Sequence, residues 1–289
     1  MKFATWQWGG ARACGLVSED GRELTPLAVP AATRHLGALV LLDLLAEGKP
    51  LPAPEGVRLP VSAVQLEAPI PRPRRNIFCV GRNYQAHAKE LSGSVFKDGA
   101  QTGDDWPIVF TKVPECVVAT GATVLLPHGI SDQIDYEAEL AVIIGKGGRN
   151  ISAANAMAHV WGYTIVNDVT ARDVQMRHKQ WDLGKSFDTF CPMGPWMVSA
   201  DECDGTDVLL TCWVNGQQRQ QSRTTDLIFD IPTLIETCSR GITLYPGDII
   251  ATGTPAGVGM GMSPPTFLKT GDRMRIEIEG IGVLENVFK

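Results

Sequence analysis

Seven of the 19 prolines in this 289-residue chain fall between residues 50 and 73, and they constrain the fold more than any other feature. Proline lacks a backbone N–H and fixes φ, so a stretch of this density continues neither a helix nor a central strand. We therefore predict a linker, with a boundary near residue 70. The boundary separates a small N-terminal module, residues 1–70, from a larger domain, residues 71–289.

The N-terminal module has the pattern of a small α+β unit. Lys2–Trp8 and Ala13–Ser18 are typical of two short strands, and the Gly9-Gly10 pair between them is typical of a turn. Leu36–Glu47 has helical spacing and ends before a glycine and a proline. The module is thus expected to combine a strand pair with one helix.

The larger domain is rich in short strands and has few helices. The strands are expected at Asn76–Val80, Ile108–Thr111, Thr123–Leu126, Asp135–Ile144, Val160–Asp168 and Asp207–Val214. Asn215-Gly216 signals a hairpin turn, and Arg273–Glu279 with Gly282–Phe288 alternate like a closing hairpin. Asp230–Arg240 is predicted to be a helix with an aspartate cap. Strand runs without regular crossover helices indicate an α+β fold with mixed sheets.

Composition limits the partners and the compartment. Hydrophobic residues make up 44% and charged residues 20%, as in an ordinary globular protein, and the formal net charge of −6 argues against nucleic acid and anionic membranes as partners. Leu36–Leu45 is too short to cross a bilayer, and no secretory signal is recognised. The seven cysteines form no CxxC pair, so reduced, buried thiols in a cytoplasmic protein are expected, Cys191 included.

Acidic residues alternate at the start of one predicted strand. Asp135, Glu137 and Glu139 would share one strand face, where three carboxylates repel each other unless a cation neutralises them. A solvent-facing edge strand, protected from aggregation by its acids, is the alternative. A second acid, Asp168, ends the apolar strand Trp161–Asp168, where burial demands a partner. Carboxylates without a nearby histidine or cysteine suit Mg²⁺, Mn²⁺ or Ca²⁺.

Three further motifs carry possible chemistry. His87 and Glu90 are three residues apart on a short predicted helix, so the carboxylate can orient the imidazole as a general base. A solvated helix face is the alternative for this pair, and a surface lysine is the alternative for Lys185. The glycine-rich segment 253–261 lacks the ending of a phosphate-binding loop, so nucleotide binding is rejected. Its backbone N–H groups and the Thr254 hydroxyl can still serve a carboxylate.

These motifs occur in one order along the chain and together resemble the fumarylacetoacetate hydrolase family over roughly residues 70–289. The segments that carry the resemblance read GRNYxxHxxE, DYExELAVIIG, GYTIxNDVTARDxQ, GKSFDTFxPxGPW, TTDLIFDIPTLI and GDIIATGTPAGVG. The resemblance implies mixed sheets folded into a roll and a homodimer. It also implies one Mg²⁺ or Mn²⁺ ion per subunit. The segment Leu91–Trp106 is longer than in compact members of the family.

The resemblance also assigns roles to residues of this chain. It implies a metal site formed by Glu137, Glu139 and Asp168. Catalysis is assigned to the dyad of His87 and Glu90, carried on a lid, and to Lys185. Substrate binding is assigned to Arg82, Lys112, Gln175 and Thr254. Asp135 shares the acidic strand face but lies outside the metal motif, so a supporting, structural role is expected for it.

Three functions are compatible with these assignments. The leading prediction is a metal-dependent hydrolase that cleaves a C–C bond in a 2,4-dioxo acid, an acylpyruvate or fumarylpyruvate, through a metal-stabilised pyruvate enolate. The alternative is a decarboxylase or isomerase of 2-oxo acids from aromatic degradation, similar to 2-hydroxyhepta-2,4-dienedioate isomerase or oxaloacetate decarboxylase. The third is a non-catalytic carboxylate-binding protein. In the first two, the lid and the N-terminal module are expected to read the distal end of the substrate.

Overall fold

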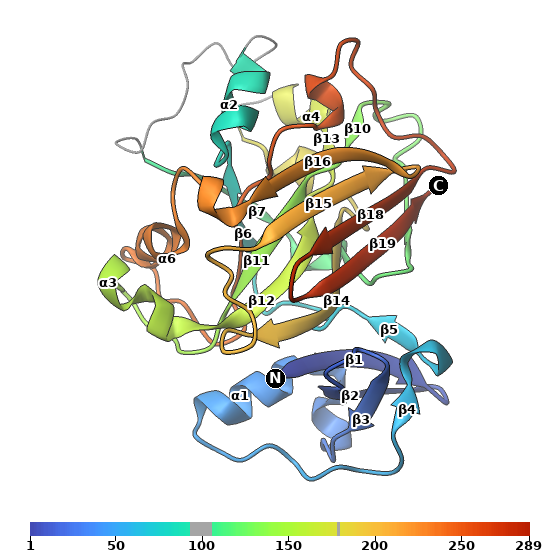
Figure 1. Cartoon of the computed structure of the whole chain (residues 1–289), viewed down its shortest axis with the longest axis vertical. Coiled ribbons are helices and arrows are strands. Elements are labelled where there is room, and N and C mark those ends of the chain that lie inside the picture. Colours follow the sequence, from blue (N-terminus) through green and yellow to red (C-terminus); the bar gives the residue numbers. More distant parts are fainter. Residues whose placement is uncertain (93–105, 178–179) are drawn as a thin grey trace.

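The computed structural model describes residues 1–92, 106–177 and 180–289, and its largest element is a mixed sheet (Figure 1). Across this sheet the order is β4 (Leu59–Pro60), β3 (Glu23–Pro26), β2 (Ala11–Val17), β1 (Lys2–Trp8), β14 (Cys191–Ser199), β12 (Val160–Asn167), β11 (Ala138–Ile144), β17 (Ile249–Ala251), β6 (Ile77–Gly81) and β7 (Ile108–Lys112). β5 (Gln65–Glu67) pairs with β1, and β8 (Val117–Val118) pairs with β14. Most neighbours are antiparallel, but β17 is parallel to β6 and β8 is parallel to β14.

Two smaller sheets complete the β structure. One has the order β16 (Gln217–Arg223), β15 (Leu209–Val214), β18 (Arg273–Ile278), β19 (Gly282–Phe288) and β9 (Thr123–Val124). The other pairs β10 (Ile134–Asp135) with β13 (Thr170–Ala171). Asn215 and Gly216 have φ of 52° and 77°, which confirms the predicted hairpin turn between β15 and β16.

Helices are short and lie outside the sheets. The α-helices are α1 (Leu39–Ala46), α2 (Gln85–Ser92), α3 (Ala153–Ala156), α4 (Arg172–Arg177), α5 (Asp182–Lys185) and α6 (Ile231–Ser239). The 3₁₀ turns are η1 (Ala31–Leu36), η2 (Val61–Ala63), η3 (Pro114–Cys116), η4 (Met157–His159), η5 (Thr224–Asp226) and η6 (Gly259–Gly261). The Asp230 side chain accepts the Thr233 N–H and caps α6 as predicted. None of the described helices is long and apolar enough to cross a membrane.

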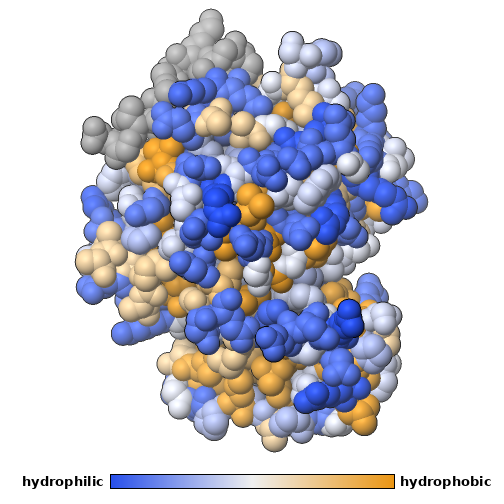
Figure 2. Space-filling view, in the orientation of Figure 1, coloured by the Kyte–Doolittle hydropathy of each residue, from blue (hydrophilic) through white to orange (hydrophobic). Residues whose placement is uncertain are grey.

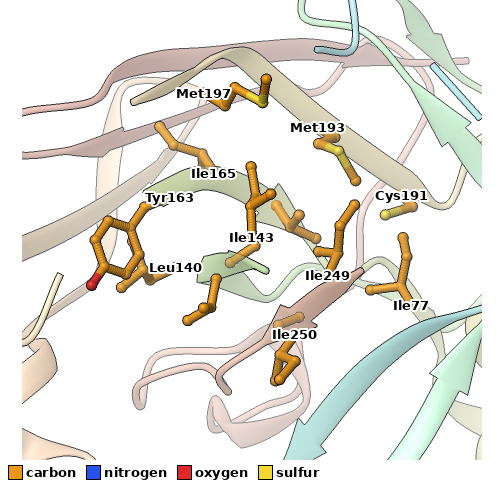
Figure 3. Packing of buried hydrophobic residues seen from close by; sticks show 14 of the residues in the cluster. Ile77, Leu140, Ile143, Tyr163, Ile165, Cys191, Met193, Met197, Ile249 and Ile250 are labelled. Atoms are coloured by element: carbon orange, nitrogen blue, oxygen red, sulfur yellow. The ribbon is translucent and has the colours of Figure 1, made fainter. Parts of the chain in front are cut away.

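The core surrounds β11, which is buried along its whole length. β12 and β17 flank it, and Leu140, Ile143, Ile165 and Ile249 all belong to the buried hydrophobic cluster around these strands (Figure 3). The alternative of a solvent-facing edge strand for the acids is therefore wrong. The continuous strand Asp135–Ile144 is also wrong, because β10 ends at Asp135 and β11 begins only at Ala138.

The N-terminal module extends the large sheet instead of standing apart from it. β1 pairs with β2 on one side and with β14 on the other, where Phe3 is opposite Met197. In Figure 1 the module lies at one end of the molecule and α2 at the opposite end. The α+β class with mixed sheets is confirmed, whereas the division near residue 70 stays a prediction.

Candidate active site and metal centre

Three buried acids meet where β11 and β12 come together. The antiparallel register sets Ala138 opposite Asn167, so Glu137, Glu139 and Asp168 fall at one end of the strand pair. One carboxylate oxygen from each lies within 4.8 Å of the other two. Backbone groups hold the acids in place. Asp168 N–H donates to the Glu137 carbonyl at 2.8 Å, and Gly253 N–H donates to Glu139 Oε2 at 2.9 Å.

Basic side chains compensate two of these acids directly. Lys185 Nζ lies 2.7 Å from both Glu137 Oε2 and Asp168 Oδ2, and Arg172 Nη2 lies 2.8 Å from Glu137 Oε1. Burial alone would raise the pKa of Glu137, but Lys185 and Arg172 hold it well below its usual range. Burial and the negative charges of Asp168 and Glu137 raise the pKa of Glu139 well above its usual range.

The cluster fits a hard divalent cation. Its donors are carboxylate oxygens, the ligands that Mg²⁺ and Mn²⁺ prefer. The pKa of Glu139 is raised because burial and the charges of Asp168 and Glu137 outweigh the opposing effect of Lys185, and a cation would favour its ionised form. Glu137, Glu139 and Asp168 could therefore hold one ion, which would supply the missing charge.

The predicted dyad is formed in the structure. His87 and Glu90 lie on α2, with 3.2 Å between His87 Nδ1 and Glu90 Oε2. Only 2% of His87 is exposed, so the solvated helix face is not what is observed. Glu90 also accepts the Gly257 N–H at 3.0 Å, which fastens α2 to the glycine-rich loop.

One small, partly open cavity joins most of the predicted site residues. It is lined by Val80, Gly81, Arg82, His87, Phe110, Glu137, Glu139, Arg172, Gln175, Trp181, Lys185 and Thr254. Its volume of about 20 Å³ holds roughly one water molecule, so entry of a larger ligand requires side chains or α2 to move. Among the described residues, those that line this cavity fall between positions 80 and 254, so none comes from the N-terminal module, and its contact with the distal end of the substrate stays a prediction. Residues 93–105, most of the long segment beside the lid, lie outside the described residues.

Lys112 is predicted to bind substrate, and the structure places it elsewhere. The side chain is fully buried, and its ammonium donates to Asp168 Oδ1 at 2.7 Å, to the Val169 carbonyl at 3.1 Å and to the Lys185 carbonyl. An ammonium has three N–H donors, so all of them are used. Burial would lower the pKa of Lys112, but Asp168 raises it above its usual value. The geometry supports a role in positioning Asp168.

Arg172 is not among the residues that the motifs assign, although it reaches the centre of the cluster. It is 1% exposed and lies between the carboxylates of Asp135 and Glu137. A signal was present in the sequence. Four neighbouring buried acids need more positive charge than Lys112 and Lys185 supply, and Arg172 follows Asp168 in the same motif.

Fold and cavity together define an enzyme, because a histidine held by a carboxylate faces the acids and the lysine. The chain belongs to the fumarylacetoacetate hydrolase family, since the family model "Fumarylacetoacetate (FAA) hydrolase C-terminal" matches residues 76–289. This confirms the family that the motifs predict.

Similar proteins span the whole chain. Oxaloacetate tautomerase YisK of Bacillus subtilis is 43% identical over 99% of both chains. Among solved structures, a fumarylacetoacetate hydrolase from Exiguobacterium antarcticum is similar with a TM-score of 0.85 and 39% identity, over 100% of this chain and 99% of that one. The 2-hydroxyhepta-2,4-diene-1,7-dioate isomerase of Mycobacterium marinum has a TM-score of 0.77 and 32% identity, over 100% and 98%.

Proposed function

We propose that this enzyme interconverts the keto and enol forms of a short 2-oxo diacid, with oxaloacetate as the first substrate to test. The observation that carries the proposal is the cavity in which the His87–Glu90 pair faces Lys185 and the acids. Similarity to an oxaloacetate tautomerase over the full length, and to a dienedioate isomerase, supports it. The isomerase alternative is thus favoured over the C–C hydrolase that the sequence placed first.

The reaction moves one proton and needs neither water nor an oxidant. His87, oriented by Glu90, would remove a proton from C3 of the 2-oxo acid and deliver it to the 2-oxo oxygen of the resulting enolate, which gives the enol; the reverse steps return the proton to C3. Two of the three Lys185 N–H donors go to Glu137 and Asp168, and the third would donate to the 2-oxo oxygen as negative charge develops there. A divalent cation, Mg²⁺ or Mn²⁺, bound by Glu137, Glu139 and Asp168 would act as a Lewis acid toward that group.

The remaining polar residues of the cavity would bind the substrate carboxylates. Arg82 is 8% exposed and Gln175 is 3% exposed, and both line it. The Gln175 carbonyl oxygen accepts from Arg172 at 3.2 Å, which turns the Gln175 NH₂ group away from that arginine and makes it a donor for a carboxylate. Phe110 and Trp181, 5.2 Å apart between ring centroids, form the apolar wall.

The test compares tautomerisation with cleavage in one preparation. We expect the enol form of oxaloacetate, followed by its ultraviolet absorbance, to decay faster with enzyme and Mg²⁺ or Mn²⁺, without stoichiometric pyruvate. His87→Gln should slow this decay by about 10²–10⁴-fold. The matched control His128→Gln, at an exposed position, should not. Stoichiometric pyruvate and acid from an acylpyruvate, with no faster enol decay, would establish the hydrolase instead.

A further inference from the structure

Asp135 lies between Arg172 and the glycine-rich loop, and its carboxylate accepts hydrogen bonds from both. The side chain is fully buried. Arg172 Nε donates to Oδ2 at 2.9 Å. From the loop, Gly259 N–H donates to Oδ1 at 2.7 Å and Met260 N–H to Oδ2 at 2.9 Å. A single carboxylate thus joins a site arginine to η6, which stands more than 120 residues further along the chain.

The other side of Arg172 reaches the acids of the cavity. Its Nη2 lies 2.8 Å from Glu137 Oε1, so the guanidinium bridges Asp135 and Glu137. The guanidinium donates a hydrogen bond to Asp135 and forms an ion pair with Glu137, so its charge holds the two carboxylates close to one another.

The other side of the loop contacts α2. Glu90 accepts the Gly257 N–H, and it also packs against Gly261. A Cβ at Gly261 would approach Glu90 Oε1 to 2.3 Å, and one at Gly259 would approach Asp135 Oδ1 to 2.8 Å. The loop therefore contacts Asp135 on one side and Glu90 on the other, with no room for a side chain in either contact.

We propose that Asp135 is a positioning residue that couples the acid cluster to the His87–Glu90 helix. It holds the loop 257–261 at a fixed distance from Arg172 and Glu137, and the loop in turn holds Glu90 and, through it, His87. The continuous series of contacts is Glu137, Arg172, Asp135, the loop, Glu90 and His87. The inference rests on the proposed function only in taking His87 as the base.

Hydrogen exchange tests the coupling without any assay of activity. In Asp135→Asn we expect the backbone amides of α2 and those of Gly259 and Met260 to exchange at least tenfold faster. The matched control is Asp248→Asn. Asp248 is also buried and accepts from an arginine, Arg75, and from a backbone N–H, that of Tyr245, but it does not line the cavity. Unchanged exchange in α2, with faster exchange at Gly259 and Met260, overturns the proposal.

Kinetics supply a second readout through a double-mutant cycle. Asp135→Asn and Glu90→Gln should each lower kcat for tautomerisation at least tenfold with a smaller change in KM. If both act through one series of contacts, the double variant should be no slower than the slower single variant. Multiplying effects would instead mean that Asp135 acts independently of Glu90, and the proposal fails. If the wild type lacks tautomerase activity, the proposed function fails and the exchange experiment still decides the coupling.

The coupling can also be tested from the other end, should Asp135→Asn not fold. Energetic coupling is reciprocal, so disturbing Glu90 must loosen the loop at Asp135. Gly261→Ala, which displaces Glu90, and Glu90→Ala should both speed amide exchange at Gly259 and Met260. Unchanged exchange there in both variants overturns the proposal.

Discussion

Glu137 and Glu139 stand two residues apart, yet the protein compensates their charges differently. Lys185 and Arg172 lie within 2.8 Å of Glu137, whereas the hydrogen bond to Glu139 comes from the uncharged Gly253 N–H. As a result, the pKa of Glu137 is lowered and that of Glu139 is raised. Of these two carboxylates, Glu139 is therefore the one whose pKa a bound divalent cation would lower most.

Metal binding should therefore release a proton. Because the folded-state pKa of Glu139 is raised, the metal-free fold keeps its proton above the ordinary carboxylate range, and ionising it there lowers stability as the pH rises. A cation needs the carboxylate, so affinity should increase with pH in that window. Titration calorimetry of Mn²⁺ in two buffers of different ionisation enthalpy measures the proton. Glu139→Gln should abolish the release, and a wild type that releases none contradicts the assignment.

Lys112 offers a second test at this scale. Lys112→Met removes one of the positive charges that neutralise the buried Asp168 carboxylate. Removing one partner of a buried ion pair lowers the free energy of unfolding by about 3–5 kcal/mol. We expect a loss of that order in urea unfolding without metal. The exposed Lys146→Met should change stability by less than about 0.5 kcal/mol. A raised KM with unchanged stability would restore the predicted contact between Lys112 and substrate.

Among the elements, α2 depends on how the chain leaves β6. Arg82 has a φ of 57°, and the buried side chain of Asn83 then bonds three backbone groups. Its Nδ2 donates to the Phe229 carbonyl at 3.0 Å and to the Thr252 carbonyl at 2.8 Å, and its Oδ1 accepts the Phe229 N–H at 2.8 Å. The start of the helix that carries His87 is thus attached to two other segments.

Asn83→Ala should be among the more destabilising substitutions in this chain. Each buried backbone group left without a partner costs about 1–3 kcal/mol, so we expect a loss of about 3 kcal/mol or more. Denaturant unfolding measures it, with the exposed Asn155→Ala as the control. A loss below about 1 kcal/mol would mean that water replaces these bonds.

For the whole molecule, the N-terminal module and the larger domain share one core. Phe3 stacks on Trp161 with 5.1 Å between ring centroids, and both belong to the cluster that contains the buried residues of β11. The Trp196 indole donates to the Ile281 carbonyl, and the same side chain packs against the small N-terminal cluster of Ala4, Trp6, Val17 and Leu24. The two parts should therefore lose their structure together.

We accordingly predict a single calorimetric unfolding transition for the metal-free protein. The pairing of β1 with β14 and the shared hydrophobic core join the two parts into one cooperative unit. Two separated peaks, the lower one abolished by deleting residues 1–70, would show that the linker isolates the module after all.

Assembly stays a prediction of the family resemblance. Figure 2 shows apolar side chains gathered on the visible face of the N-terminal module. In the same module, Trp8 is 54% and Val57 is 70% exposed. Surface of this kind favours association. Sedimentation should give a mass near twice 31.2 kDa. A monomer at micromolar concentration contradicts the dimer.

Local patterns in the sequence determined most elements and the place of the acids. The Asp230 cap, the Asn215-Gly216 turn and the apolar run Ala138–Ile144 each act through neighbours in the chain, so periodicity and turn chemistry suffice to find them. The order of the family motifs also predicted that Glu137, Glu139 and Asp168 meet and that His87 contacts Glu90. In the structure, the register of β11 and β12 brings the acids together, and the three-residue helical spacing brings His87 to Glu90.

Only the tertiary structure determined which buried charged side chains pair with one another. The strand breaks between β10 and β11, so Asp135 does not share a continuous strand face with Glu137 and Glu139. Its carboxylate instead accepts hydrogen bonds from Arg172 and from the backbone amides of Gly259 and Met260. Lys112 lies behind Asp168, and β1 joins β14 across nearly 200 residues of sequence. Burial is the physical reason. A charge or strand edge shielded from water must find a partner, and that partner depends on which distant segments pack beside it.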